Sequence, residues 1–396
     1  VGYNSLNQNT TGTENTAVGA FALDANTSAS YSTAVGYNAL SASTGSSNTA
    51  VGRASLNVTT TGYQNTAVGA SALDANTTGI RNTAIGEQAL TDSTTSSNNT
   101  AVGRSALASN TTGSENTAVG SQCLDNNTTG TNGVAMGYHA LGVNTSGNNN
   151  TAVGMRALEA NTTAHNNVAV GSFALDATTT ASNNTAVGYA AAGANTTGTE
   201  NVAVGTFALD GCTTGSENTA IGYEALSASL TQGGNTAVGR KALKACTSGV
   251  NTAVGGKALE STTTGSSNIA MGYAAMTNNT TGSSNVALGR NALYTNTTAD
   301  NNTAIGRSAL EVNTTGTQNT SVGTYSLDAN TSASNNTAVG YNTLSANTTG
   351  AENTAVGAKA LDASSTGAYN TAIGTSALGS STTASLNTAV GRGALF

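Results

Sequence analysis

The chain has 396 residues, of which only 8% are charged and 4% aromatic, and its formal net charge of -7 is thinly spread. Its twelve Lys and Arg residues are scattered and form no basic stripe for contacts with phosphates. No stretch of about 18 apolar residues is present that could cross a bilayer as a helix. Nucleic-acid binding and membrane insertion are therefore not expected for this segment.

One short motif recurs along the whole chain. The Gly of Ala-Val-Gly falls at Gly2 and Gly19 and continues to Gly391, 24 times in all, almost always in steps of 17 residues. Two steps have 16 residues, and both lose a residue between the Leu of the motif and the next Asn, in segments 41–47 and 244–250. Because surface loops tolerate deletions, we expect this part of each repeat to be a loop.

Each repeat begins with Asn-Thr-Ala-Val-Gly, continues with two variable residues and Ala-Leu, and ends in a polar turn, usually Asn-Thr-Thr-Gly. Seventeen residues are too few for a pair of helices but suit one coil of a solenoid. The sequence therefore predicts an all-β fold, a parallel β-solenoid of 24 stacked 17-residue coils. We expect a single repetitive domain over residues 1–396, cut in mid-repeat at both ends, and a rod of roughly 110 Å at about 4.8 Å per coil.

Two apolar positions recur in each repeat. The residue immediately before the Gly is always aliphatic or Met, and the residue two positions before the Gly is nearly always Ala. Leu, again preceded by Ala, forms the second apolar position. We predict that the aliphatic and the Leu positions form the buried core, represented by Val18, Leu23, Val68, Leu73, Val119, Leu124, Val153 and Leu158.

An Asn precedes the strand in almost every repeat. We predict that these residues form a ladder, in which each side-chain amide bonds the amide of the next coil and the neighbouring turn backbone. Its members include Asn15, Asn48, Asn65, Asn82 and Asn116.

The restriction of adjacent strand positions bears on assembly. Successive strand residues face opposite sides, so an aliphatic residue beside an invariant small one means that neither side varies freely. Strands buried on both sides show this pattern. We therefore expect a parallel homotrimer packed about a common axis, with a monomeric rod and lateral packing into a sheath as the alternatives.

The motif Asn-Thr-Ala-Val-Gly-x-x-Ala-Leu, followed by Asn-Thr-Thr-Gly, resembles the repetitive shafts of phage and bacterial tail-fibre-like proteins. It is also similar to the head repeats of trimeric autotransporter adhesins, which stack as a left-handed parallel β-roll in a three-chain bundle. The resemblance covers the whole chain and implies a trimeric left-handed β-roll located outside the cell, on its surface or on a virion. The repeat here is longer than that of the adhesin head.

No arrangement of residues predicts catalysis, a cofactor or a metal, and we expect no enzyme. Cys212 and Cys246 occupy the same loop position two coils apart, roughly 10 Å, which is too far for an unstrained disulfide. Cys123 takes a small Ala position and is expected to be a buried thiol. His139 and His165 lie in different positions of the repeat, without neighbouring ligands, and are expected to be surface residues.

Asn-Thr-Thr and Asn-Thr-Ser triplets recur in the loop and are formally N-glycosylation acceptors. They include Asn26, Asn76, Asn110, Asn161 and Asn313. The alternative interpretation is that they are unmodified turn residues.

Three functions remain open. The first is a structural fibre shaft, a rigid spacer that presents a terminal domain. The second is a surface adhesin that contacts glycans or partner cells through its outer face. The third is an ice-binding solenoid, which the replacement of Thr by Val in one row and the irregular loop row disfavour. The expected partners are other copies of this chain, with a cell-surface or glycan receptor as a further possibility.

Overall fold

A computed structural model describes residues 1–228 and 231–395. Two compact units, Val1–Glu200 and Asn201–Phe396, are described separately. The first contains eleven strands of three residues each: β1 (Thr16–Val18), β2 (Thr33–Val35), β3 (Thr49–Val51), β4 (Thr66–Val68), β5 (Thr83–Ile85), β6 (Thr100–Val102), β7 (Thr117–Val119), β8 (Val134–Met136), β9 (Thr151–Val153), β10 (Val168–Val170) and β11 (Thr185–Val187).

In its described residues the second unit contains twelve strands of the same length: β12 (Val202–Val204), β13 (Thr219–Ile221), β14 (Thr236–Val238), β15 (Thr252–Val254), β16 (Ile269–Met271), β17 (Val286–Leu288), β18 (Thr303–Ile305), β19 (Thr320–Val322), β20 (Thr337–Val339), β21 (Thr354–Val356), β22 (Thr371–Ile373) and β23 (Thr388–Val390). The described residues contain no helix. The predicted all-β parallel solenoid is confirmed.

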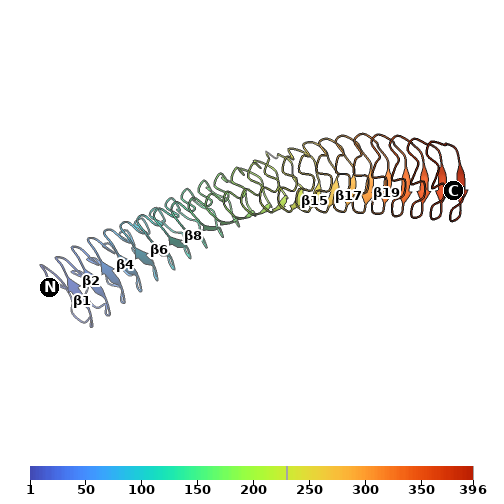
Figure 1. Ribbon diagram of the computed structural model, residues 1–396. Coiled ribbons are helices and arrows are strands. Elements are labelled where there is room, and N and C mark those ends of the chain that lie inside the picture. The colour runs from blue at the N-terminus through green and yellow to red at the C-terminus, as the bar shows by residue number, and fades with distance from the viewer. Residues whose placement is uncertain (229–230, 396) are drawn as a thin grey trace. The chain divides into compact units, whose positions relative to one another are not determined.

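Within each unit every strand pairs in parallel with the strand of the next coil (Figure 1). The register is constant, so Thr66 lies opposite Thr83 and Val68 opposite Ile85. The two 16-residue steps do not disturb it, because β2 and β3 pair Thr33 with Thr49, and β14 and β15 pair in the same way. The missing residue is therefore accommodated outside the strand, as predicted.

Tight turns close each coil after its strand. In the coil that follows β4, the Ala72 amide donates to the Gly69 carbonyl at 3.4 Å, and the Asn76 amide donates to the Leu73 carbonyl at 3.4 Å. Ser71 and Leu73 have positive φ angles of 53° and 54°. The sequence does not indicate these positive φ angles, because Leu is unfavourable in the left-handed region of backbone conformations.

Gly69 has a φ of 141°, and a Cβ there would lie 2.4 Å from the carbonyl oxygen of the equivalent Gly86. The motif Gly is therefore required both by the backbone conformation and by the close approach of the next coil. Turn amides bond that coil as well: Leu73 donates to Ala89 at 2.9 Å, for example. The polar backbone of the turns is thus satisfied by stacking.

The core lies inside each coil, and it differs from the predicted one at the strand. The leucines Leu23, Leu73, Leu124 and Leu158 are buried. The aliphatic residues of the strand point outward: Val18 and Val68 are 44% and 36% exposed, and Val119 and Val153 are half-buried. The prediction that these four valines form the core was wrong.

The middle residue of each strand, Ala in all but one case, fills the interior instead. Ala67, Ala118 and Ala152 are completely buried, whereas the residues on either side of each are not. Strand alternation places the first and third residues together on the opposite side. The small Ala is thus needed because the interior of the coil is narrow, holding mainly Ala, Leu and Asn side chains.

Candidate functional surfaces

The Asn before each strand forms the first of two ladders. Asn65 accepts a hydrogen bond from the backbone amide of Asn82 in the next coil at 2.9 Å. Its Nδ2 donates to the carbonyl of Gly79, in the turn of that coil, at 2.9 Å. Asn48 makes the same two bonds, to Asn65 and Gly62. The main link between coils is therefore side chain to backbone, and direct amide–amide contacts, such as Asn82 to Asn65 at 3.2 Å, are longer.

The other ladder positions are similar. Asn15, Asn82 and Asn116 each donate to a turn carbonyl of the following coil, at 2.7, 2.8 and 2.9 Å. Asn116 also accepts from the backbone amide of Gly133, where the Asn of the next coil is missing. The ladder thus continues where Gly133 replaces Asn, because the side-chain oxygen of Asn116 needs only a backbone amide as its donor.

A second ladder runs through the loop, and the sequence analysis missed it. Nδ2 of Asn127 donates to Oδ1 of Asn110 at 2.8 Å, and the bond repeats from Asn144 to Asn127 and from Asn161 to Asn144. Each of these Nδ2 atoms also donates to a carbonyl of its own turn, such as Gly130 at 3.1 Å. The recurrence of Asn at a fixed loop position was the available signal, but it was interpreted as a turn or glycosylation motif.

Burial excludes glycosylation of these asparagines in the folded protein. Asn26, Asn76, Asn110, Asn161 and Asn313 are all 0% exposed. A glycan on the side-chain nitrogen would replace a ladder donor and could not fit inside the coil. These triplets are therefore structural turn residues.

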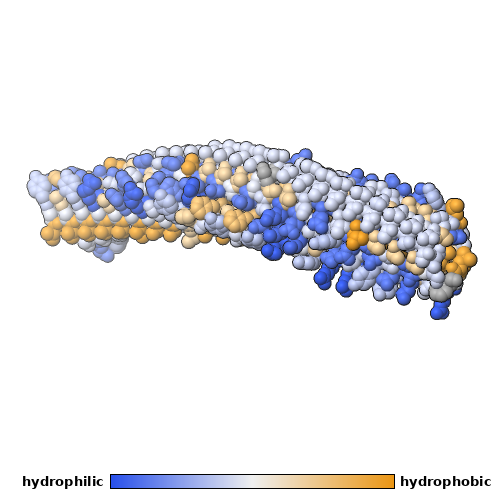
Figure 2. All heavy atoms as spheres, turned by 45° about the horizontal axis from the view of Figure 1, so that its top comes forward, coloured by the Kyte–Doolittle hydropathy of each residue, from blue (hydrophilic) through white to orange (hydrophobic). Residues whose placement is uncertain are grey.

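The first and third residues of the strands form an outward surface, here called the strand face. Its third position is 36% exposed at Val68 and 40% at Ile85, and 44% at Met136. The hydroxyls of Thr66 and Thr83, in its first position, have no hydrogen-bond partner in the described part of the protein, whereas the loop hydroxyl of Thr77 donates to the carbonyl of Thr94 at 3.0 Å. Figure 2 shows a continuous hydrophobic row along the lower edge at the left of the view, beside surface that is mostly of intermediate hydropathy with hydrophilic patches.

A second outward surface, here called the variable face, is formed by three positions of each repeat. These are the two residues after the motif Gly and the one residue after the motif Leu. It holds most of the aromatic and charged side chains. Phe173 packs edge-on against Tyr189, with ring centroids 5.9 Å apart, and the Arg156 guanidinium lies 5.5 Å from the Phe173 ring centre. Arg156 also forms an ion pair with Glu159.

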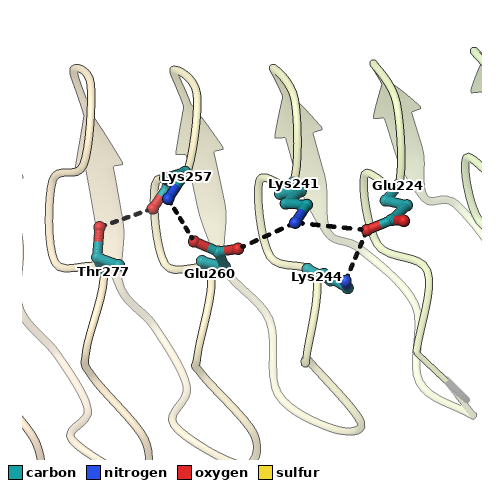
Figure 3. A network of polar contacts seen from close by, with 6 residues as sticks. All are labelled: Glu224, Lys241, Lys244, Lys257, Glu260 and Thr277. Atoms are coloured by element: carbon teal, nitrogen blue, oxygen red, sulfur yellow. Dashed lines mark hydrogen bonds and ion pairs between the residues drawn. The ribbon is translucent and has the colours of Figure 1, made fainter.

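Ion pairs link three successive coils of the second unit (Figure 3). The Lys244 ammonium lies 2.6 Å from Glu224, and Lys241 lies 4.0 Å from both Glu224 and Glu260. The hydrogen bond from Lys244 lowers the pKa of Glu224. Lys257 lies 3.9 Å from Glu260, so charges of opposite sign alternate along the network from Glu224 through Lys241 and Glu260 to Lys257. The paired side chains are partly exposed to water, which screens the charges, so each pair is expected to contribute little to stability.

Aspartates follow the Leu in several coils of the variable face. Partial burial raises the pKa of Asp74, Asp125, Asp176, Asp210 and Asp328 above the ordinary value of 3.8. One carboxylate oxygen of Asp74 and one of Asp328 are buried without a hydrogen bond. These carboxylates are therefore a small destabilising element at neutral pH.

All three cysteines are free and buried. Burial raises the pKa of Cys123 to about 12 and the pKa values of Cys212 and Cys246 to about 11. Cys123 occupies the interior Ala position, and Cys212 and Cys246 replace Asn in the loop ladder. Buried thiols with raised pKa values are unreactive, so these residues act by packing.

The two histidines lie in different environments. His139 is half-buried, and its Nε2 lies 3.1 Å from Oε1 of Gln122, while Nδ1 of the exposed His165 accepts a hydrogen bond from the Asn148 amide at 2.9 Å. Among the described residues, no three His, Cys, Asp or Glu side chains gather as metal ligands. A search of the same residues finds no helix with the length and apolarity needed to cross a membrane.

Comparison with protein-family models and with curated proteins finds no match to this chain.

Proposed function

We propose that this chain is the structural shaft of an extracellular or virion fibre, a spacer that holds a terminal domain away from a surface. The observation that carries the proposal is the constancy of the coil: strand register, interior and Asn ladders are kept along each unit, while the variable face changes. A protein selected for a single binding site has no need of such uniformity.

The energetics suit a spacer of adjustable length. Each coil adds one buried Leu, worth roughly 1.5 to 3 kcal/mol on burial, and two sets of ladder hydrogen bonds to its neighbours. Stability in stacked repeats is close to a sum over units and their interfaces. Coils can therefore be added or removed without a new design of the interior.

The resemblance to tail-fibre shafts and to adhesin head repeats supports the same function. It covers the full length of the chain and concerns the residues that build the coil: the strand, the Gly, the Leu and the Asn. It contributes the expectation of a homotrimer outside the cell or on a virion.

Deletion of three coils tests the proposal. Removal of residues 69–119, which are 51 residues, joins Val68 to Gly120 and restores the motif. We expect an unchanged circular dichroism spectrum and a maximum dimension, by small-angle X-ray scattering, shorter by about 14 Å. As the control, removal of residues 69–110 joins Val68 to Thr111 out of phase and should disrupt the adjacent coils. An unchanged maximum dimension after the in-phase deletion would rule out the spacer.

A glycan-binding adhesin is the second candidate, and the aromatic pairs of the variable face favour it. Tyr138 and Tyr189 are about half exposed and offer ring surfaces with polar tips. If the chain binds sugars on a glycan array, Tyr138→Ser with Tyr189→Ser should abolish binding, while Tyr369→Ser in the loop should not. Absence of binding by the parent chain rejects this candidate.

A further inference from the structure

The dipeptide Asn-Gly occurs once in the chain, at Asn132-Gly133, although asparagine is abundant. Gly133 replaces the Asn of the first ladder and is buried, and Asn132 is the exposed turn residue before it. Asparagine loses its side-chain amide most readily when glycine follows, because glycine has no side chain to hinder attack by its backbone nitrogen. This dipeptide is therefore the chain's candidate for spontaneous chemical modification.

The reaction takes place within the chain and needs only water as a co-reactant. The backbone nitrogen of Gly133 gives up its proton and bonds to Cγ of Asn132, the bond from Cγ to Nδ2 breaks, and ammonia leaves with that proton. Water then opens the succinimide ring at one of its two carbonyls, which leaves either aspartate or isoaspartate at position 132. The attacking atom is the Gly133 nitrogen, so whatever holds that nitrogen controls the rate.

The folded chain holds both reacting groups. The Gly133 amide donates to Oδ1 of Asn116, in the preceding coil, at 2.8 Å. The Asn132 amide donates to the carbonyl of Ser114, in that same coil, at 3.2 Å. Nδ2 of Asn132 donates to Oγ1 of Thr131 at 3.4 Å. Attack therefore requires the coil that leads into β8 to separate from the coil before it.

We propose that Asn132-Gly133 is a deamidation site that the first Asn ladder controls. Asn116 withholds the Gly133 nitrogen while the two coils are in contact, and release of their hydrogen bond permits the reaction. The inference does not depend on the proposed shaft, because it concerns one turn and the coil beside it.

The same glycine weakens the coil to which it belongs. Asn116 bonds the amide of Gly133 and the carbonyl of Gly130 in the coil that follows it. Gly133 has no side chain with which to make the equivalent two bonds to its own following coil. The coil is thus tied by this ladder on one side only, and it should open locally more often than its neighbours.

The products change the turn permanently. Aspartate adds a charge, and isoaspartate adds the β-carbon to the main chain, which moves the Gly133 nitrogen away from Asn116. Deamidation therefore records openings of this coil that are too brief to populate a separate state.

Two neighbouring turns provide controls within the same molecule. Asn149 and Asn166 occupy the same turn position in the next two coils and are also exposed. Their φ angles are 58° and 59°, against 56° for Asn132. Each is followed by Asn and not by Gly. A difference in rate between Asn132 and these two residues cannot come from exposure or backbone conformation.

The test is incubation of the full chain at mildly alkaline pH, with and without denaturant, followed by peptide mass mapping of the three turns. In denaturant, Asn132 should convert well before Asn149 and Asn166. In the folded chain its conversion should be slower by more than about tenfold, because only the open fraction reacts.

Variants test the role of the ladder. Asn116→Ala removes the acceptor of the Gly133 amide and should accelerate conversion of Asn132 in the folded chain by about 5-fold to 150-fold. The matched control, Asn302→Ala, removes the equivalent ladder bonds in the second unit and should leave the rate at Asn132 unchanged. Gly133→Asn restores the usual ladder residue and should slow conversion of Asn132 to the rate of Asn149, even in denaturant.

Equal conversion of Asn132 in the folded and the denatured parent chain overturns the proposal, as does an absence of conversion in denaturant. Equal rates at Asn132 in the Asn116→Ala and Asn302→Ala variants overturn it too. Circular dichroism shows whether Asn116→Ala is folded. If that variant does not fold, the comparison of the parent chain with and without denaturant still decides the result.

Discussion

Removal of one asparagine from the first ladder should destabilise the fold more than its size suggests. In Asn65→Ala, the Asn82 amide loses its acceptor at 2.9 Å, while the Gly79 carbonyl loses one donor at 2.9 Å and keeps another, Nδ2 of Asn76 at 3.2 Å. Asn65 and Asn82 are 1% and 0% exposed, so water cannot easily replace either bond. A buried polar group left without a partner costs about 1 to 3 kcal/mol. Only the Asn82 amide is left in that state, so the loss should be about 1 to 3 kcal/mol.

The effect should be local, because each coil contacts mainly its neighbours. Native-state hydrogen exchange of the Asn82 amide is therefore the assay. A loss of about 1 to 3 kcal/mol corresponds to exchange faster by about 5-fold to 150-fold. Amides many coils away should keep their protection.

Two variants control this result. Gln64→Ala changes the preceding residue, which has a positive φ, unlike Asn65, and an exposed side chain, and should change protection very little. Asn65→Asp keeps the acceptor for the Asn82 amide but loses the donor to Gly79. Equal protection of Asn82 in Asn65→Ala and in the parent chain would show that the ladder does not hold the coils together.

Three further predictions follow from burial and charge. Leu158→Ala should lower the free energy of unfolding by about 2 to 5 kcal/mol. Val153→Ala, on the strand face, should lower the free energy of unfolding of the unassembled chain by less than about 1 kcal/mol. Denaturant titration measures both losses, and equal losses would contradict the assignment of the interior. Because burial raises the pKa values of Cys123, Cys212 and Cys246 to about 12, 11 and 11, iodoacetamide at mildly alkaline pH should label them only after unfolding, and rapid labelling of the folded chain would contradict their burial. Burial raises the pKa values of five aspartates, so their carboxyl groups bind protons more tightly in the folded state than in the unfolded state: Asp74, Asp125, Asp176, Asp210 and Asp328. The stability gained by protonating them is complete below pH 3.8, the ordinary pKa, and is lost as the pH rises through the folded pKa values. The melting temperature should therefore rise on mild acidification, and Asp74→Asn should weaken that rise.

Much of this fold could be derived from the sequence because a fixed period leaves few arrangements. The 17-residue step identified the solenoid, the position of the strand, and the loop in which the two short repeats lose a residue. The constant Leu and the constant Asn before the strand were also informative, because few environments demand one residue type in nearly every copy. Both lie inside the coil.

The tertiary structure decided which side of the strand faces inward. Alternation shows that Ala67 and Val68 face opposite ways, but it does not say which is inside, and hydrophobicity alone favours Val. Closure of the coil places Ala67 inside and Val68 outside. Leu73 and the Asn side chains already occupy the narrow interior, and the space that is left fits only a small side chain such as Ala. The same closure turns Asn110 inward and makes a ladder of what looked like a surface turn. It also holds Leu73 at a positive φ that its residue type disfavours, because packing of the side chain and the hydrogen bonds of the turn outweigh the local backbone preference.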